Sequence, residues 1–398
     1  MEKLAEYSAL RVQNVDLGFK RYLWNKIDWD NRLIAITGAR GVGKTTLLLQ
    51  HIREHLGGRP DEVLFVSMDD LYFTKTSIVD FADEFVKRGG RYLFLDEIHK
   101  YPGWSREVKN AYDYFSELNI VITGSSALDI YRGTADLSRR AVLYRLKGLS
   151  FREYIELRHK YVFPVISLDE LLKDPSKHIY AILDKIKPIK LFEEYLHLGY
   201  YPFFIEDTGA YHIRLRQTIN HVLETDLPSI ENIDYKSVYQ LRRLLAVIAE
   251  LVPFKPNILK LSKQLGISRE TLMKYLQLLA RAGLLLMLDP GTRGISRMNK
   301  PEKVYLENTN LLFALTDSQV KTGTMRETFL LNQLSEGYTV FYSGQGDFFA
   351  DNKYTIETGG KLKTRKQVAE VANAYIAADN IEYAYKNKIP LWLFGFLY

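Results

Sequence analysis

Short apolar runs separated by longer mixed segments shape the first part of the chain. The runs occupy residues 33–37, 63–67, 92–96, 120–123 and 142–146. Runs that are apolar on both faces are typical of parallel strands covered by helices, and the segments between them are long enough to hold those helices. The pattern therefore predicts an α/β fold with a parallel sheet for a domain at residues 1–150, whose α/β core starts near residue 30.

Beyond residue 150 the apolar positions recur at helical spacing. Residues 151–235 predict a helical lid or connector, whose leucine and aromatic faces indicate packing rather than a site. Residues 236–305 predict a winged helix, with helices at 241–251 and 258–265, a third that follows Ser268 to about Ala282, a strand at 284–288 and a basic wing. The outward face of the third helix is expected to carry Arg269, Glu270, Lys274 and Gln277, as in a recognition helix.

The last region, residues 306–398, predicts a small α/β domain. A helix is expected around residues 327–334, and strands at 339–342 and 354–357. The closing stretch, residues 389–398, is apolar but too short to span a bilayer. We interpret it as a buried strand, with a partner-docking tail as the alternative.

The first candidate site follows the first apolar run. Residues 38–45 read GARGVGKT, which fits the P-loop pattern G-x-x-x-x-G-K-[ST] between a strand and a helix-like run. The glycines let successive backbone N–H groups face a triphosphate at the start of the helix. Lys44 supplies charge to the phosphates, and the Thr45 hydroxyl is a ligand for Mg²⁺. The expected cofactors are ATP and Mg²⁺, with GTP left open, and the expected binding residues are Gly38, Ala39, Arg40, Gly41, Val42, Gly43, Lys44, Thr45 and Thr46.

The third and fourth apolar runs end in polar residues that suit a phosphate site. The third ends in Asp96 and Glu97, and in a P-loop enzyme such an aspartate holds Mg²⁺ while the glutamate orients or deprotonates the attacking water. The fourth leads to Ser125, which either senses the γ-phosphate or caps the next helix. Arg139 and Arg140 are candidates for stabilising transition-state charge, in their own chain or in a neighbouring copy.

Composition narrows the class of protein. With 398 residues and 46% hydrophobic content, the chain is predicted to form two or three domains with real cores. The lack of cysteine excludes disulfides, zinc-thiolate sites and a catalytic thiol, and it favours a cytosolic setting. A net charge of +6 permits contact with nucleic acid or an anionic membrane, but it is equally typical of a slightly basic surface. The charged N-terminus and the lack of a run of about 18 apolar residues predict neither secretion nor a membrane span.

Several of these motifs occur together in one known family. The P-loop, the stretch from Leu95 to His99, YPGW at 101–104, TGSS at 123–126 and LSFREY at 149–154 resemble prokaryotic AAA+-type ATPases. Members of this family carry an uncharacterised C-terminal region that is similar to restriction-endonuclease folds. GYYP at 199–202 and ETGGK at 357–361 also look like family landmarks, so the resemblance covers nearly the whole chain. It implies an AAA-like ATPase core, a winged-helix module and a nuclease-like tail, without a defined cellular role.

The resemblance also suggests acids for a second site. Restriction-type nucleases place one acid on a strand and Glu-x-Lys on the next, to hold Mg²⁺ and activate water. Gly359 stands where the lysine belongs, and Lys361 or Lys363 further along would have a different aim. We therefore expect a nuclease fold without strong cleavage, in which the weak candidate metal ligands are Asp347 and Glu357, with Glu327 in support.

Together the patterns predict a cytoplasmic ATPase that hydrolyses ATP with Mg²⁺ and is coupled to a winged helix and a nuclease-like domain near DNA. A nucleotide-dependent switch with little hydrolysis and an ATP-gated nuclease are the alternatives. DNA and protein are equal alternatives as partners of the winged helix, because the same fold serves both. A homo-oligomer also stays open.

Overall fold

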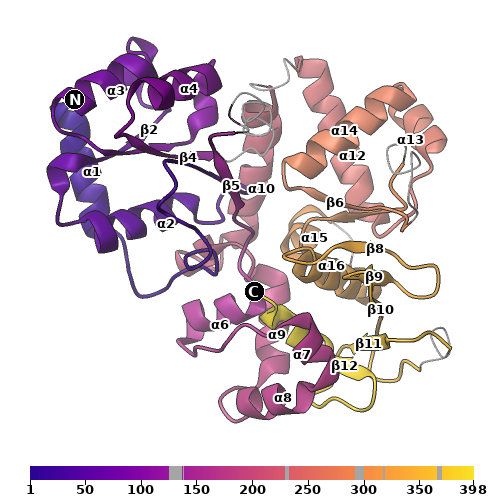
Figure 1. Cartoon of the computed structure of the whole chain (residues 1–398). Coiled ribbons are helices and arrows are strands. Elements are labelled where there is room, and N and C mark those ends of the chain that lie inside the picture. The colour runs from indigo at the N-terminus through magenta and orange to yellow at the C-terminus, as the bar shows by residue number, and fades with distance from the viewer. Residues whose placement is uncertain (125–136, 138, 229–232, 292–299, 317–318, 365–369) are drawn as a thin grey trace. The chain divides into compact units, whose positions relative to one another are not determined.

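The computed structural model spans the whole chain and describes it outside residues 125–136, 138, 229–232, 292–299, 317–318 and 365–369 (Figure 1). The chain divides into two compact units: the first holds Met1–Gly148 and Glu224–Ile233, and the second holds Leu149–Leu223 and Asp234–Tyr398. The segment Glu224–Ile233, which was expected in the helical connector, belongs instead to the first unit. The division of the remaining residues into three domains stays a prediction.

A five-stranded sheet forms the centre of the first unit. Its strands are β1 (Leu33–Thr37), β2 (Val63–Ser67), β3 (Tyr92–Asp96), β4 (Asn119–Gly124) and β5 (Val142–Arg145). They lie in the order β2-β3-β4-β1-β5, and every neighbouring pair is parallel. The predicted α/β fold with a parallel sheet is therefore confirmed. Strand β5 differs from the expectation in that its residues alternate between half-buried and exposed, because it is an edge strand.

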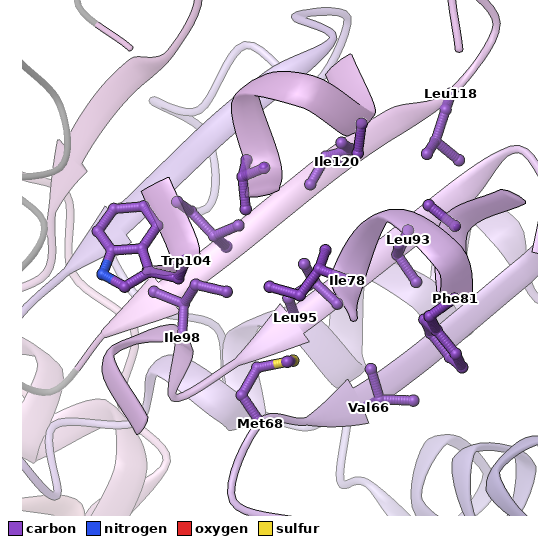
Figure 2. Packing of buried hydrophobic residues seen from close by; sticks show 14 of the residues in the cluster. Val66, Met68, Ile78, Phe81, Leu93, Leu95, Ile98, Trp104, Leu118 and Ile120 are labelled. Atoms are coloured by element: carbon purple, nitrogen blue, oxygen red, sulfur yellow. The ribbon is translucent and has the colours of Figure 1, made fainter. Parts of the chain in front are cut away.

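One face of this sheet is covered by two helices, as Figure 2 shows. Alternate residues of the strands point to this face, including Val66 of β2 and both Leu93 and Leu95 of β3. Helix α3 (Ile78–Lys87) supplies Ile78 and Phe81, and helix α4 (Trp104–Tyr114) supplies Trp104, Val108 and Ala111. Fully burying each large apolar side chain stabilises the fold by roughly 1.5–3 kcal/mol, so the strand ends that carry the site are held by a solid core.

The first unit also contains helices outside this face and several single turns. Two further helices are α1 (Glu2–Asn14) and α2 (Lys44–His51). Single turns of 3₁₀ or π helix are η1 (Ile52–Leu56), η2 (Pro60–Glu62), η3 (Leu71–Thr74) and η4 (Ile98–Lys100).

The second unit begins with the predicted helical region. Its helices are α6 (Phe151–His159), α7 (Leu168–Lys173), α8 (Pro175–Leu183), α9 (Pro188–Leu198) and α10 (Tyr211–His221), with the turn η5 (Pro202–Ile205). After α10 the chain continues directly into the π-helical turn η6 (Val222–Asp226), which carries it into the first unit.

The next elements include the three helices and the first strand that the sequence predicts, although the first helix begins six residues earlier and a second strand was not expected. They are α12 (Tyr235–Leu251), α13 (Ile258–Leu265), α14 (Arg269–Arg281) and the antiparallel strands β6 (Leu285–Leu288) and β7 (Lys303–Leu306). The Ser268 side chain caps α14 by accepting a hydrogen bond from the Thr271 backbone N–H at 3.0 Å. Leu272 and Leu276 are buried, while Arg269 and Lys274 are exposed. Most of the predicted wing falls at 292–299, outside the described residues.

The chain ends in a mixed five-stranded sheet. Helices α15 (Thr309–Leu315) and α16 (Thr322–Leu334) precede it, and its strands are β8 (Val340–Tyr342), β9 (Phe348–Ala350), β10 (Tyr354–Gly359), β11 (Ala374–Ala378) and β12 (Lys388–Pro390). The strand order is β12-β11-β10-β9-β8, in which β8 to β10 are antiparallel and β10 to β12 are parallel. The closing stretch is buried as expected, but it is a strand only to Pro390 and then becomes the 3₁₀ helix η9 (Leu391–Phe396). No described helix has the length and apolar composition that crossing a bilayer requires.

Candidate functional site

The P-loop connects the end of β1 to the start of α2. Gly41 and Gly43 adopt φ angles of 84° and 97°, in the left-handed region that favours glycine. Gly38 is needed for a different reason, since a Cβ atom there would lie 2.3 Å from the backbone oxygen of Leu146. The loop conformation thus depends on three residues without side chains.

Lys44 lies inside this loop rather than on the surface. Its Nζ donates hydrogen bonds to the backbone oxygens of Gly38 at 2.9 Å and Ala39 at 3.0 Å. Burial lowers the pKa of Lys44, while the carboxylates of Glu97 and Asp96 act in the opposite direction. The ammonium group is therefore held at the loop, close to the acid pair, where a bound phosphate would meet it.

Asp96 links the P-loop to two neighbouring strands. The Thr45 hydroxyl donates to Asp96 Oδ2 at 2.8 Å, and the Thr123 hydroxyl donates to Asp96 Oδ1. Strand β4 lies between β1 and β3, so Thr123 at its end stands between the loop and the aspartate. Burial raises the pKa of Asp96, and the hydrogen bonds from Thr123 and Thr45 oppose that shift. Sequence patterns assigned no role to Thr123, although its place at the end of an apolar strand marked this edge of the sheet.

Glu97 follows in a backbone conformation that is uncommon for a residue with a side chain. Its φ angle is 52°, and its backbone N–H donates to the Thr123 hydroxyl at 3.2 Å. Such left-handed residues cluster at functional sites because the surrounding structure must hold them in place. Glu97 Oε2 and Arg40 NH1 are buried, and neither has a hydrogen-bond partner among the described residues. These atoms without hydrogen bonds, together with the Thr45 hydroxyl beside Asp96, fit a nucleotide with Mg²⁺.

Asp226 joins this site from a distant part of the sequence. Its Oδ1 accepts a hydrogen bond from Lys100 Nζ at 2.9 Å and lies 3.8 Å from His99 Nε2, while its Oδ2 lies 3.8 Å from Arg40 NH1. His99 Nε2 also lies 3.4 Å from Glu97 Oε2, and Arg40 NH1 lies 4.0 Å from the same atom. No motif pointed to Asp226, because a single acid at the end of a helical segment usually belongs to a solvated face.

Arg21, a third residue missed by the sequence patterns, supports the P-loop from outside. The Arg21 guanidinium is buried and donates to the backbone oxygen of Val42 in the loop. It also donates to the backbone oxygens of Lys147 at 2.7 Å and Gly148 at 2.9 Å, just beyond β5. Arg21 therefore ties the loop to the neighbouring edge of the sheet.

Of the other catalytic candidates, the structure describes only the two arginines, and it separates them from this site. Ser125 lies outside the described residues. Arg139 and Arg140 precede strand β5, and Val142 of β5 pairs with Ile34 near the start of β1. The two arginines therefore lie near the end of the sheet where these strands begin, whereas the P-loop follows the other end of β1. The two ends are about 16 Å apart, the length of a five-residue strand. Arg140 instead pairs with Asp113, at 2.8 and 3.0 Å. The expectation that either arginine acts in its own chain is therefore corrected, and a role in a neighbouring copy stays a prediction.

A separate polar pocket of about 530 Å³ lies in the second unit, beside β10. Its charged lining residues are Lys303, Arg326, Glu327, Asp347, Glu357 and Lys363. Lys303 Nζ lies 3.0 Å from Glu327 Oε2 and 3.9 Å from Asp347 Oδ1. Burial, and then the nearby Asp347 carboxylate, raise the pKa of Glu327. Within the described part of the chain, no group of three or more histidine, aspartate or glutamate side chains is arranged to hold a metal ion.

The pocket corrects one expectation about its lysine. Lys363 Nζ lies 2.6 Å from Glu357 Oε1, although its distance along the chain suggested a different aim. The chain turns back after β10, where the Lys363 backbone N–H donates to the Gly360 oxygen at 2.9 Å. A Cβ atom on Gly359 would lie 2.5 Å from the Lys363 Cβ, so the missing side chain makes room for this lysine.

The predicted recognition surface contains a smaller hollow of about 410 Å³. It lies at the N-terminal ends of α13 and α14, and its basic lining residues are Lys255, Arg269 and Lys300. Lys255 pairs with Glu302, whereas Arg269 is exposed at the start of α14. The hollow therefore presents positive charge next to two helix N-termini.

Comparison with known proteins agrees with the first site. A family described as an AAA domain matches residues 30–155, and a domain of unknown function (DUF8612) matches residues 189–322. A relative from Methanocaldococcus jannaschii, Uncharacterized protein MJ1637, is 27% identical over 380 residues, which is 88% of this chain and 80% of that protein. The first match supports a P-loop ATPase domain of the AAA type at residues 30–155.

Solved structures show weaker similarity. AMPPCP-bound DnaA from Aquifex aeolicus is 14% identical, with a TM-score of 0.26, over 64% of this chain and 83% of that chain. PCH-2 from C. elegans is 16% identical, with a TM-score of 0.27, over 69% of this chain and 67% of that chain.

Proposed function

We propose that the chain is an ATPase that hydrolyses ATP with Mg²⁺ at the P-loop. One observation carries the proposal: the carboxylate of Asp96 is shared between the hydroxyls of Thr45 and Thr123. This arrangement places the loop residue that binds Mg²⁺ in P-loop enzymes against the acid that does the same. Glu97 follows directly in the chain, so a base for water lies beside them. The match of residues 30–155 to an AAA domain supports the same activity.

Each residue has a role that follows from its position. The backbone N–H groups of the loop and the Lys44 ammonium bind phosphate oxygens, and Thr45 and Asp96 would hold Mg²⁺. Mg²⁺, when bound, adds positive charge at the phosphates. Glu97 orients the attacking water and takes its proton. Arg40 belongs to the same loop, and its guanidinium donates hydrogen bonds to the phosphate oxygens as negative charge develops on them.

Two substitutions test this assignment. Lys44→Ala should abolish nucleotide binding because it removes the charge at the phosphates, and Glu97→Gln should keep binding while turnover falls by roughly 10²–10⁴-fold. Both are measured with a fluorescent ATP analogue and steady-state phosphate release, with Lys75→Ala, an exposed lysine of the same unit, as control. Wild-type affinity in Lys44→Ala would refute the site. Binding without measurable wild-type turnover would favour the nucleotide-dependent switch instead.

We further propose that the second unit contacts the backbone of DNA through the residues at the start of α14. The exposed Arg269 and the basic hollow that it shares with Lys300 support this role. Arg269→Glu combined with Lys300→Glu should remove binding to a labelled duplex, and wild-type binding should weaken as salt rises, because phosphate contacts release counterions. Reversal of Arg59 and Lys75, two exposed cations of the first unit, is the charge-matched control. A wild type that binds no DNA at low salt would indicate a protein-packing module.

The pocket beside β10 supports recognition of a nucleic-acid backbone more than its cleavage. Its acids are paired with basic side chains, Glu327 and Asp347 with Lys303 and Glu357 with Lys363. One observation favours the alternative of an ATP-gated nuclease, namely that Lys363 reaches Glu357. Incubation with supercoiled plasmid, Mn²⁺ or Mg²⁺, and ATP distinguishes the two. Cleavage that is lost in both Lys363→Met and Glu357→Ala would establish the nuclease, while binding without cleavage agrees with recognition.

A further inference from the structure

The segment Glu224–Ile233 has an unusual place in the fold. It packs with the first unit, yet the residues before and after it, Leu223 and Asp234, both belong to the second unit. After leaving the first unit at Gly148, the chain therefore returns to it for this short segment. Within the segment, the side chain of Asp226 is 1% exposed and faces the residues around Glu97.

The burial of Asp226 needs explanation, because a buried carboxylate is costly unless basic partners compensate. Burial alone would raise the pKa of Asp226, but His99 and Lys100 lower it to well below its usual range. The carboxylate thus stays charged, and the partners that keep it charged lie within reach of the nucleotide site. The free-energy cost of burying the Asp226 carboxylate is therefore offset only while His99 and Lys100 lie beside it.

Two basic residues beside Asp226, His99 and Arg40, also lie close to Glu97. His99 Nε2 lies between Asp226 Oδ1 at 3.8 Å and Glu97 Oε2 at 3.4 Å. Arg40 NH1 lies between Asp226 Oδ2 at 3.8 Å and Glu97 Oε2 at 4.0 Å. Each basic group is therefore shared between two carboxylates. Without Asp226, the Arg40 guanidinium would be attracted more strongly toward Glu97, and the Glu97 carboxylate would be drawn into an ion pair instead of facing water.

We propose that Asp226 is a positioning residue of the ATPase site, which holds Arg40 and His99 so that the Glu97 carboxylate stays available to the attacking water. Hydrolysis then depends on whether Glu224–Ile233 is seated in the first unit. Because both flanks of that segment belong to the second unit, the arrangement couples the second unit to ATP turnover without changing the P-loop. This inference rests on the proposed ATPase function.

Asp226→Asn is the direct test, since it keeps the shape of the side chain and removes its charge. We expect kcat for ATP to fall on the order of ten- to a hundredfold, as for other misplacements of a reacting group. Nucleotide affinity and KM should stay within about twofold, because Lys44 and Thr45 are untouched. Asp234→Asn is the matched control: Asp234 caps α12 by accepting from Ser237, and asparagine caps equally well.

A double-mutant cycle with Lys100 separates positioning from general damage. Lys100→Gln removes the partner at 2.9 Å from Asp226, and it should lower kcat because Asp226 is then incompletely paired. The double variant should turn over ATP no more slowly than Asp226→Asn, since both changes break the same interaction. Losses that multiply would show that the two residues act independently, which contradicts the proposal.

The remaining outcomes are also decisive. If Asp226→Asn turns over ATP like the wild type while Glu97→Gln does not, the inference is overturned and the ATPase assignment stands. If Asp226→Asn no longer binds nucleotide, Asp226 is only structural and the inference is again overturned. If the wild type binds nucleotide but shows no turnover, hydrolysis is refuted, and hydrogen exchange decides the rest. Nucleotide binding should then protect residues 97–101 and 224–228 together in the wild type but not in Asp226→Asn, and equal exchange in both would overturn it.

Discussion

The Thr123 hydroxyl offers the sharpest test of the site, because it joins both acids. It donates to Asp96 Oδ1 and accepts the hydrogen bond from the Glu97 backbone N–H at 3.2 Å. Thr123→Val removes both interactions and leaves the volume of the side chain nearly unchanged. Thr123 is fully buried, so water cannot replace the lost hydroxyl without rearrangement.

The expected loss can be estimated from the two hydrogen bonds. A buried bond to a charged group contributes roughly 1.5–3 kcal/mol and a neutral one roughly 1 kcal/mol, so the free energy of unfolding should fall by about 2–4 kcal/mol. Thr123 also lowers the pKa of Asp96 against the effect of burial. Its loss should also leave the Asp96 carboxylate with only one of these two hydroxyl partners, Thr45, so that a ligand for Mg²⁺ is less well positioned. The Mg²⁺ concentration for half-maximal ATP turnover should rise.

Thr37→Val is the matched control. Thr37 is also fully buried and ends the adjacent strand β1, but its hydroxyl donates only to the neutral backbone oxygen of Tyr144 at 3.3 Å. Its loss should cost about 1 kcal/mol and leave the Mg²⁺ dependence unchanged. Urea unfolding followed by tryptophan fluorescence, and ATP turnover against Mg²⁺, measure the two effects. Equal behaviour of the two variants in both assays would refute the idea that Thr123 organises the acids.

Two further predictions concern other parts of the chain. Burial lowers the pKa of His51 from 6.5 to about 3, so only the unfolded chain takes up its proton as the pH falls. The free energy of unfolding should therefore drop by about 2 kcal/mol from pH 7 to pH 5, and urea titrations should show this loss shrinking in His51→Phe. In the second unit, Gly359→Ala should displace Lys363 from Glu357 and weaken DNA binding as much as Lys363→Met does. Gly344 lines the same pocket, and a Cβ atom there would meet only open space. The control variant Gly344→Ala should therefore bind DNA like the wild type in the same titration.

Much of the first unit could be predicted because its signals are local. Strands buried on both faces exclude polar residues, so the apolar runs marked β1 to β4 directly, while the fifth run marked the edge strand β5 although that strand is not buried. Parallel strands end at one edge of the sheet, which is why Thr45 and Asp96 could be expected to meet. Arg140 was a candidate only as an arginine near the motifs in sequence; it precedes the last strand and therefore lies at the opposite end of the sheet.

Other features depend on contacts that local patterns do not record. Asp226 reaches Lys100 across 126 residues, and only the tertiary fold brings the two together. The aim of Lys363 was derived from the alternation of side chains along a strand, but β10 ends at Gly359 and the chain then turns back. The helical end of the chain was expected as a strand because a short apolar run is equally compatible with a buried strand and a buried helix.

The nucleotide site and the pocket beside β10 differ in the groups that contact their acidic side chains. This difference decides which function we propose for each site. Hydroxyl groups of Thr45 and Thr123 hold Asp96, so a divalent cation can approach the carboxylate without displacing another positive charge. In the pocket beside β10, Lys363 already lies 2.6 Å from Glu357, and a metal ion would have to compete with that ammonium group. A phosphate meets the opposite situation, because it is attracted by the same lysine. We therefore propose Mg²⁺-dependent chemistry at the nucleotide site and binding of an anionic backbone in the second pocket, where cleavage would require Lys363 to move toward the phosphate.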